Sequence, residues 1–158
     1  MDIKIRRAEP KDGTAVINLL KQIGALHHEG RPDLFRADAR KYDQNEFEQK
    51  LLNADEPVLV AVNDKDEVVG YMFGQIEERH DHPVLCDVRM LYVDDLCVDE
   101  NVRGGGIGKK LMDGACELAK ELNCSKIYLN VWEFNENARN FYEKYGMTTF
   151  KRYMELEL

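Results

Sequence analysis

The sequence predicts an α/β fold of the α+β type over residues 1–158, with β-hairpins first and a βαβ unit last. Two apolar runs, Val58–Val62 and Val68–Ile76, flank the turn-forming residues Asn63–Asp66, which is typical of a hairpin. Farther along, an amphipathic helical pattern lies between two β-branched runs, as in a parallel βαβ unit. The length of 158 residues fits one ordinary domain.

Regular spacing of apolar residues locates the elements of the N-terminal half. Ile3 and Ile5 alternate with Lys4 and Arg6, and apolar residues then recur at helical spacing as far as Leu26. In order, we expect a strand at 3–6, a helix from about Gly13 to His27–Gly30, a loop at Arg31–Phe35, a helix capped by Asp38 or Asp43 and ending near Asn53, strands at Val58–Val62 and Val68–Ile76, a loop or twisted hairpin end at Glu77–Pro83, and a strand at Val88–Val98.

The C-terminal half alternates strands and helices. An apolar face repeats through Gly105–Leu122 at helical spacing, and a β-branched and aromatic strand follows at Lys126–Val131. A second, short helix covers Asn135–Tyr145 and stops at Gly146, a residue typical of the position after a helix. We expect Met147–Leu158 to form a final strand.

Composition and charge exclude several classes of protein. Hydrophobic residues make up 44% of the chain, which is enough for a packed core and excludes a disordered protein. No apolar run approaches the roughly 20 residues that cross a bilayer, and no secretory signal is visible, so we expect a cytoplasmic protein without membrane association. The net charge of −8 argues against nucleic-acid binding and favours a cationic partner.

The cysteines and histidines predict no disulfide and no metal site. Cys86, Cys97, Cys116 and Cys124 show no C-x-x-C spacing and lie in apolar stretches, so we expect buried free thiols. The pattern His80-Asp81-His82 has the spacing of one strand face, but no third ligand stands at a recognisable position.

A glycine-rich turn, Arg103–Gly108, lies between a predicted strand and a predicted helix. Glycines allow backbone N–H groups to approach an anion at a helix N-terminus, where the helix dipole also favours negative charge. The turn does not match the P-loop, because Lys109 is followed by Lys110 rather than Ser or Thr. It does not match the G-x-G-x-x-G dinucleotide fingerprint either, but it does match R-x-x-G-x-G.

Two motifs in a fixed order carry a resemblance to a known family. Leu96–Asp99 followed by Arg103–Gly108 resembles the acetyl-CoA-binding motif of the GNAT superfamily of N-acetyltransferases, and Asn135–Met147 resembles its second signature, N-x-x-A-x-x-F-Y-x-x-x-G-[FM]. The resemblance covers essentially the whole chain. It implies a mixed, mostly antiparallel central sheet with helices on both faces and a C-terminal parallel βαβ unit.

The resemblance also implies an activity. The expected reaction moves the acetyl group of acetyl-CoA to a primary amine, by direct attack in a ternary complex. The acceptor is a small amine, an antibiotic amine, or a peptide or protein N-terminus, and a homodimer is possible. The alternative is a non-catalytic acyl-CoA-binding module that acts as a sensor or an interaction partner.

The resemblance implies a set of cofactor-binding residues. The backbone around Leu96 and Val98 pairs with the pantetheine arm, and amides of the glycine turn hold the pyrophosphate. The full expected set is Leu96, Cys97, Val98, Arg103, Gly104, Gly105, Gly106, Ile107, Gly108, Lys109, Asn135, Ala138 and Tyr142. Asn135 is at the same time the expected N-cap of its helix.

The expected catalytic residues are Tyr142, Asp94 and Tyr92. Tyr142 is the general acid that protonates the departing CoA thiolate, as in the family. For the general base, strand alternation puts Tyr92 and Asp94 on the face of Leu96 and Val98, with Asp95 on the other face. A bulge in the strand would reverse that choice. Glu77, Glu78 and Asn130 are further candidates on neighbouring elements.

The acceptor-binding wall is expected between the first two helices. His27, His28 and Phe35 lie in or beside the loop at 31–35, and loops at that place line the substrate groove in the family. Glu78 and Asn130 complete the expected substrate contacts.

Overall fold

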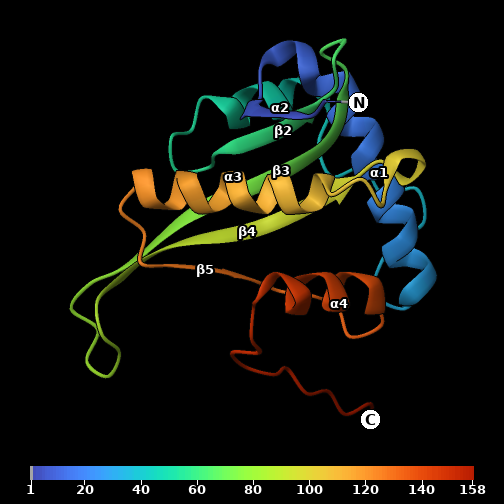
Figure 1. The fold of residues 1–158 in the computed structure, drawn as a ribbon. Coiled ribbons are helices and arrows are strands. Elements are labelled where there is room, and N and C mark those ends of the chain that lie inside the picture. The colour runs from blue at the N-terminus through green and yellow to red at the C-terminus, as the bar shows by residue number, and fades with distance from the viewer. Residues whose placement is uncertain (1) are drawn as a thin grey trace.

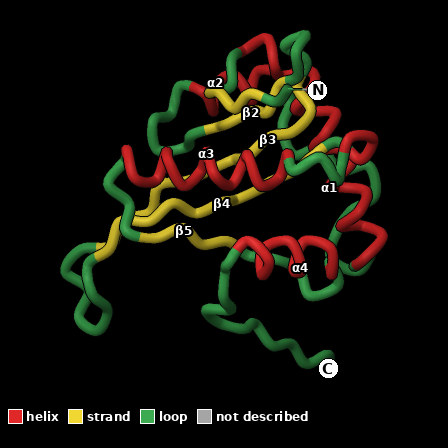
Figure 2. The backbone as a smooth tube through the Cα atoms, in the orientation of Figure 1, coloured by secondary structure: helices red, strands yellow, loops and turns green. Residues whose placement is uncertain are grey.

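The computed structural model describes residues 2–158, and within them the chain forms a five-stranded sheet in the order β1-β2-β3-β4-β5 (Figures 1 and 2). All neighbouring strands are antiparallel except β4 and β5, which are parallel. The elements are β1 (Lys4–Arg7), η1 (Pro10–Asp12), α1 (Gly13–Gly30), α2 (Gln44–Leu51), β2 (Val58–Val62), β3 (Val68–Arg79), β4 (Val88–Val98), η2 (Glu100–Val102), α3 (Ile107–Glu121), β5 (Lys126–Leu129) and α4 (Glu136–Tyr145). The predicted fold class is confirmed.

Helices cover both faces of the sheet. Helix α3 lies across one face (Figure 1), where Leu111, Ala115 and Leu118 are buried against the sheet at helical spacing. Helices α1 and α2 cover the opposite face with a second apolar cluster that includes Val16 and Phe47. No helix within residues 2–158 is both long and apolar enough to span a membrane.

Side chains at the helix ends explain where the helices begin and end. Asp43, not Asp38, caps α2: its carboxylate accepts the backbone N–H of Glu46 at 2.9 Å, and the Glu46 carboxylate accepts the N–H of Asp43. Asn135 caps α4 by accepting the N–H of Ala138 at 3.1 Å, as expected. Gly146 ends α4 with φ of 108°, a conformation that other residues adopt at a cost.

Two predictions about strands differ from the structure. Strand β3 continues past its predicted end at Ile76 to Arg79, because Glu77 and Glu78 pair with Met90 and Arg89 of β4 at the end of the β3–β4 hairpin, the second of the two forms expected for this segment. The predicted final strand at 147–158 is absent: these residues have no strand partner in the described chain. Alternation of apolar and polar residues is a local pattern, whereas a strand also needs a neighbouring strand to pair with, and that strand comes from elsewhere in the chain. Among the cysteines, Cys86 is exposed, contrary to expectation.

A β-bulge in β4 changes which side chains share a face. In the β3–β4 ladder, Phe73 pairs with Asp95 and the next residue, Gly74, pairs with Val93. Asp94 therefore has no pairing partner in β3. Gly74 fits here because a Cβ would lie only 2.8 Å from Leu91 Cδ1.

The bulge reverses the side-chain alternation along β4. Leu96 and Val98 lie on the α3 face with Leu91 and Val93, whereas Cys97 belongs to the cluster under α1 and α2. The expectation that Tyr92 shares a face with Leu96 and Val98 is therefore wrong, since the extra residue shifts every position after it. Tyr92 lies on the face of Cys97, here called the acceptor side.

Candidate active site

The glycine turn leaves a row of backbone donors at the start of α3. Gly104 and Gly106 have φ of 88° and 74°, and a Cβ at either position would meet no atom within 4 Å. In the described part of the chain, no protein acceptor takes the backbone amides of residues 103–109. The first turn of α3 also lacks acidic residues. These observations fit an anion such as a pyrophosphate at the positive end of the helix dipole.

Of the three cations near the turn, only Arg103 bonds to the end of β4. Its Nε donates to the carbonyl of Val98 at 2.9 Å, which ties the turn to the end of β4. Lys109 pairs with Asp113 at 2.7 Å, and Lys110 donates to the carbonyl of Ile3 at 3.1 Å. Arg103 therefore supplies the guanidinium beside the turn, whereas the expected Lys109 side chain points along the helix.

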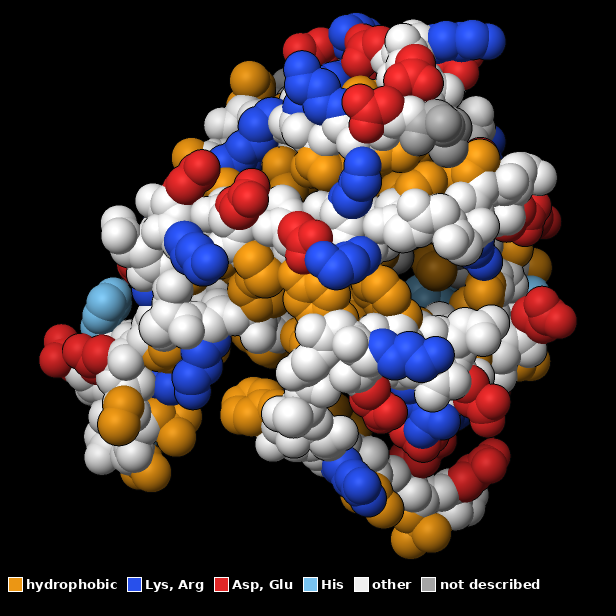
Figure 3. All heavy atoms as spheres, in the orientation of Figure 1, with side chains coloured by type: hydrophobic (Ala, Val, Ile, Leu, Met, Phe, Trp, Pro, Cys, Tyr) orange, Lys and Arg blue, Asp and Glu red, His pale blue; other side chains and the backbone are white. Residues whose placement is uncertain are grey.

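The edge of β4 is open next to this turn. Strand β5 pairs with β4 only from Met90 to Val93, so residues 94–98 have no strand partner on that side. Figure 3 shows a hollow between the N-terminal ends of α3 and α4, with hydrophobic side chains at its floor. An open strand edge can pair with an extended chain that carries amide groups. The edge and the turn thus fit the pantetheine arm and the pyrophosphate of a CoA molecule.

Helix α4 packs against the first turn of α3 and carries Tyr142 to the site. The Phe141 ring packs beside Gly108, where a Cβ would lie 3.2 Å from the ring. The Tyr142 hydroxyl has no hydrogen-bond partner among residues 2–158. Burial raises the pKa of Tyr142, and the charge of Asp95 raises it further. The phenol therefore keeps its proton at neutral pH.

Two carboxylates and a lysine meet at the bulge. Lys41 Nζ lies 2.7 Å from Asp94 Oδ2 and 3.5 Å from Asp95 Oδ2. The Asp94 side chain is 31% exposed and that of Asp95 is 12% exposed, so Asp95 is the deeper of the two.

The electrostatics of Asp95 and Lys41 follow from this arrangement. Burial raises the pKa of Asp95; the charge of Lys41 opposes the rise, and that of Asp94 adds to it. Burial disfavours the Lys41 ammonium, yet the charges of Asp95 and Asp94 outweigh this and raise its pKa. An aspartate with a raised pKa is a stronger base than an ordinary one.

An aromatic cluster of His27, Phe35, Trp132 and Phe134 lies near these carboxylates. Ring centroids are 4.9 Å apart for His27 and Phe35, 5.0 Å for Phe35 and Trp132, and 6.3 Å for His27 and Phe134. Burial lowers the pKa of His27, and Asp95 and Lys41 are close enough for their charges to act on it. His28 supports the loop through a 2.7 Å contact between its Nδ1 and the carbonyl of Phe35.

The sequence reasoning missed Trp132 and Phe134, although it singled out His27 and Phe35. Both missed residues lie between β5 and α4, outside any periodic pattern. Trp132 is 41% exposed, an unusual state for so large a ring. The available signal was that these two aromatic residues stand directly before the second family motif, which begins at Asn135.

The remaining predicted residues fall into two groups. Asn130 donates to the Tyr92 hydroxyl at 3.1 Å, so these two meet on the acceptor side. Glu78 does not lie at the site. It pairs with Arg89 in β4, and Arg89 is seven residues, or roughly 20 Å of strand, away from Leu96 at the open edge. Glu77 hydrogen-bonds with Tyr128. Burial raises the pKa of Cys97 to about 12, so its thiol stays protonated.

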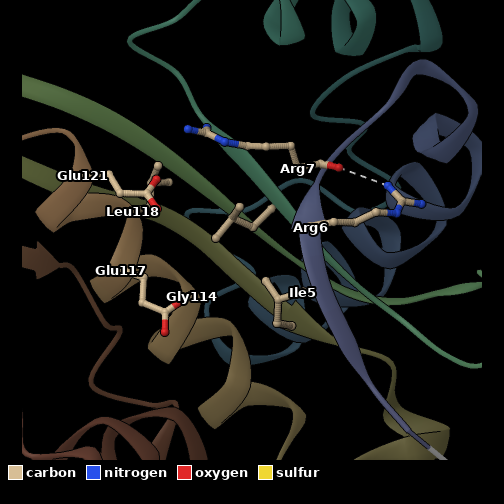
Figure 4. Close-up of a pocket in the computed structure, with 8 residues that line it drawn as sticks. Ile5, Arg6, Arg7, Gly114, Glu117, Leu118 and Glu121 are labelled. Atoms are coloured by element: carbon tan, nitrogen blue, oxygen red, sulfur yellow. Dashed lines mark hydrogen bonds between the residues drawn. The ribbon is translucent and has the colours of Figure 1, made fainter.

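A separate groove of about 200 Å³ lies between β1 and the C-terminal half of α3 (Figure 4). Its lining includes the apolar side chains of Ile5 and Leu118 and the charged side chains of Arg7, Glu117 and Glu121. It lies on a different part of α3 from the glycine turn, and it shares no residue with the site described above.

A mixed sheet that opens beside a glycine turn at a helix N-terminus is the arrangement expected of an acyltransferase that binds CoA. The model of the acetyltransferase (GNAT) family matches residues 23–147, and the chain belongs to this family. The resemblance seen in the two sequence motifs is thereby confirmed.

The chain is similar to several members of the family over most of its length. It is 31% identical to the peptidyl-lysine N-acetyltransferase YjaB of Escherichia coli over 147 residues, 92% of this chain and 82% of that protein. It is 27% identical to an uncharacterized N-acetyltransferase of Lactobacillus delbrueckii subsp. lactis, over 96% of this chain and 88% of that protein. A crystal structure of a mutant BH1408 protein from Bacillus halodurans superposes with a TM-score of 0.94 at 31% identity, covering 98% of this chain and 99% of that one.

Proposed function

We propose that the protein transfers the acetyl group of acetyl-CoA to a primary amine on a flexible, cationic aliphatic arm, by direct attack in a ternary complex. One observation carries this proposal: the open edge of β4 runs from the glycine turn to the carboxylates at the bulge. Acetyl-CoA bound along that edge and an amine bound at the bulge would therefore lie next to each other in one site.

The chain's own residues supply the binding contacts. The amides of residues 103–109 and the Arg103 guanidinium hold the pyrophosphate, and the backbone of Leu96 and Val98 pairs with the pantetheine arm. The Asn135 side-chain NH₂ is free to bind, because its oxygen is occupied as the helix cap. Acetyl-CoA supplies the acetyl group as a thioester with CoA thiolate as the leaving group.

Asp95 and Tyr142 are the two residues proposed to transfer protons. An amine reaches the site as an ammonium and must lose a proton before its lone pair can attack. We assign this proton to Asp95, directly or through a water molecule, because Asp95 is the more buried of the two aspartates and burial raises its pKa. Asp94, more exposed, receives the incoming cation. Tyr142 holds the proton that the thiolate takes, since its pKa is raised and its hydroxyl is free.

The acceptor class follows from charge and ring chemistry beside the bulge. Asp94 and Asp95 attract a cation, and the aromatic cluster offers ring faces along which an aliphatic ammonium chain can lie. Relatives named for amines of this kind support the choice: the peptidyl-lysine enzyme above, and a spermine/spermidine N(1)-acetyltransferase of Bacillus subtilis that is 33% identical over 35% of this chain. A lysine side chain is the acceptor that we favour.

The test combines acetyl-CoA titration with a thiol-release assay over an amine panel. The panel contains a lysine peptide, spermidine and glucosamine 6-phosphate, and a dimethyl-lysine peptide serves as the matched control that keeps the cation but lacks a transferable position. We expect acetyl-CoA binding, turnover with the lysine peptide and none with its dimethyl form. Binding without turnover on any amine would favour a non-catalytic acyl-CoA-binding module instead.

A further inference from the structure

The Tyr71 hydroxyl is a buried polar group without a partner. Tyr71 lies in β3, its side chain is fully buried in the apolar cluster under α1 and α2, and its hydroxyl meets no hydrogen-bond partner among residues 2–158. Proteins rarely bury a hydroxyl in this state, because the group loses its hydrogen bonds to water. A phenylalanine would fill the same space without that cost, so packing alone does not explain the hydroxyl.

The strand register places Asp95 within reach of this hydroxyl. Tyr71 pairs with Cys97 in the antiparallel ladder of β3 and β4 (Figure 1), and Asp95 lies two residues before Cys97. Residues two apart in a strand share a face, and the bulge at Asp94 lies outside this interval. Asp95 is therefore the diagonal neighbour of Tyr71, at a typical separation of roughly 7–8 Å, which an aromatic side chain can span. The Asp95 side chain is only 12% exposed, so both groups lie on the inner side of the site.

The electrostatics of the two groups agree with this placement. Burial raises the pKa of Tyr71 well above its ordinary value, and the charge of Asp95 raises it further. Burial also raises the pKa of Asp95, and the Tyr71 hydroxyl is among the groups that hold that pKa down. Tyr71 therefore stays protonated at neutral pH and is a donor, and an ionised Asp95 is the acceptor that it lacks.

Other titratable groups act on Asp95 from the elements packed around it. They are His27 of α1, Lys41 of the α1–α2 loop, Asp94 and Cys97 of β4, and Tyr142 of α4. Cys97 and Tyr142 stay neutral, because burial raises both of their pKa values, and burial lowers the pKa of His27. Lys41 supplies the main positive charge, but its ammonium lies where the proposed acceptor must arrive. A hydroxyl on the buried side is not displaced by that acceptor.

We propose that Tyr71 is a positioning residue for the reaction: its hydroxyl donates to the Asp95 carboxylate from the buried side and leaves the other carboxylate oxygen for the acceptor amine. This role rests on the proposed function, because Asp95 is the base of that reaction. When an N–H bond of the ammonium breaks, an O–H bond forms at Asp95 and the lone pair stays on nitrogen. Tyr71 keeps its own proton, since a hydroxyl donates to the carboxylate before the transfer and accepts from the carboxylic acid after it.

Loss of this donor is expected to make Asp95 harder to ionise. A hydrogen bond to a charged group is strong enough to lower the pKa of a carboxyl by about one to two units. Tyr71→Phe removes the hydroxyl and keeps the ring, so the pKa of Asp95 should rise by that amount. The acid limb of the kcat/KM profile should rise with it, because only an ionised Asp95 accepts the proton of the amine. A role in packing alone would move neither quantity.

The first test is a direct measurement of the pKa of Asp95 in the full chain, by an NMR titration of labelled side-chain carboxyl groups without substrate. Asp95→Asn identifies the signal. Tyr145→Phe is the matched control, because its hydroxyl donates instead to Asp113 at 2.8 Å. We expect an upward shift of about one to two units in Tyr71→Phe and none in the control. An Asp95 pKa that is the same in Tyr71→Phe and in wild type overturns the proposal.

The second test is the pH dependence of kcat/KM with the best amine of the panel. In Tyr71→Phe we expect the acid limb to move up together with the pKa of Asp95, and most of the lost rate to be recovered at pH values above that limb. An unmoved limb beside a shifted Asp95 pKa overturns the role of Tyr71 in the reaction. Absence of turnover on every amine is a failure of the proposed function instead, and the NMR titration then still decides whether Tyr71 donates to Asp95.

Discussion

Lys41 places its ammonium 3.5 Å from the Asp95 carboxylate, although the two residues lie 54 positions apart in the chain. Lys41 belongs to the loop between α1 and α2, and Asp95 follows the bulge of β4. The contact therefore connects two parts of the proposed site. The α1–α2 loop is expected to contact the acceptor amine, and β4 is expected to bind acetyl-CoA. It also shows that this site stabilises an aliphatic ammonium, which is the kind of group that we propose as the acceptor.

Removal of the Lys41 charge is expected to shift the pH dependence of the reaction. The charge of Lys41 opposes the rise in the pKa of Asp95, so Lys41→Met lets that pKa rise further. The acid limb of the kcat/KM profile then moves to higher pH, because Asp95 must be ionised to accept a proton. Lys41→Arg keeps the charge and is expected to keep the limb near its wild-type position. An unchanged limb in Lys41→Met would mean that another group controls it.

Asp95→Asn is expected to lower kcat by about 10²–10⁴-fold, the usual contribution of a general base. Asp94→Asn is the matched control at the neighbouring position, and there we expect mainly a higher KM for a cationic amine. The measurement is a full kinetic analysis of both variants with the best amine of the panel. A larger loss of kcat in Asp94→Asn than in Asp95→Asn would reverse the assignment of the base.

The same Asp95→Asn variant is expected to be more stable than wild type at neutral pH. Burial raises the pKa of Asp95 in the folded state, so folding favours its protonated form. Its contribution to stability is present at low pH and is lost as the pH rises through the raised pKa. Asparagine avoids burying the charge, while Lys41 keeps Asp94 at 2.7 Å. Thermal unfolding should show a higher Tm at pH 7 and a smaller gain as the pH falls; a lower Tm at pH 7 contradicts this account.

Gly106→Ala is expected to weaken acetyl-CoA binding by more than its effect on folding explains. The φ of 74° strains any side chain there by about 1–2 kcal/mol, and relief of the strain moves the amides of the turn. Gly146→Ala provides the control, because its φ of 108° is also positive and its Cβ would also be in open space. Both variants should lose Tm, and titration should show a raised acetyl-CoA Kd for Gly106→Ala alone. Equal affinities in the two variants would remove the turn from the binding site.

Local patterns were sufficient to predict most of the fold. The hairpin after Val58, the crossover through α3 and the caps at Asp43 and Asn135 depend on residues close together in the chain, and the structure contains all of them. The glycine turn was also visible, because a run of three glycines has few other uses in a folded chain.

Long-range packing decided what the sequence could not. The bulge at Asp94 depends on Gly74 of the neighbouring strand, which approaches Leu91 and Pro57 too closely for a side chain, and no pattern within β4 contains that information. The segment at 147–158 alternates as a strand does, yet pairing requires a partner strand that the described chain does not provide. Trp132 and Phe134 join the site only because the loop after β5 folds against α1.

Tyr142→Phe tests the central claim most directly, because it removes one oxygen atom and leaves the ring, its packing and the open edge of β4 in place. We measure kcat with the best amine and the acetyl-CoA Kd beside it, for this variant and for Tyr145→Phe on the same helix, whose hydroxyl donates instead to Asp113 at 2.8 Å. The account predicts a loss of about 10²–10⁴-fold in kcat with little change in Kd for Tyr142→Phe, and near wild-type turnover for Tyr145→Phe. Wild-type turnover in Tyr142→Phe would contradict the account, because no proton donor would then be assigned to the departing thiolate.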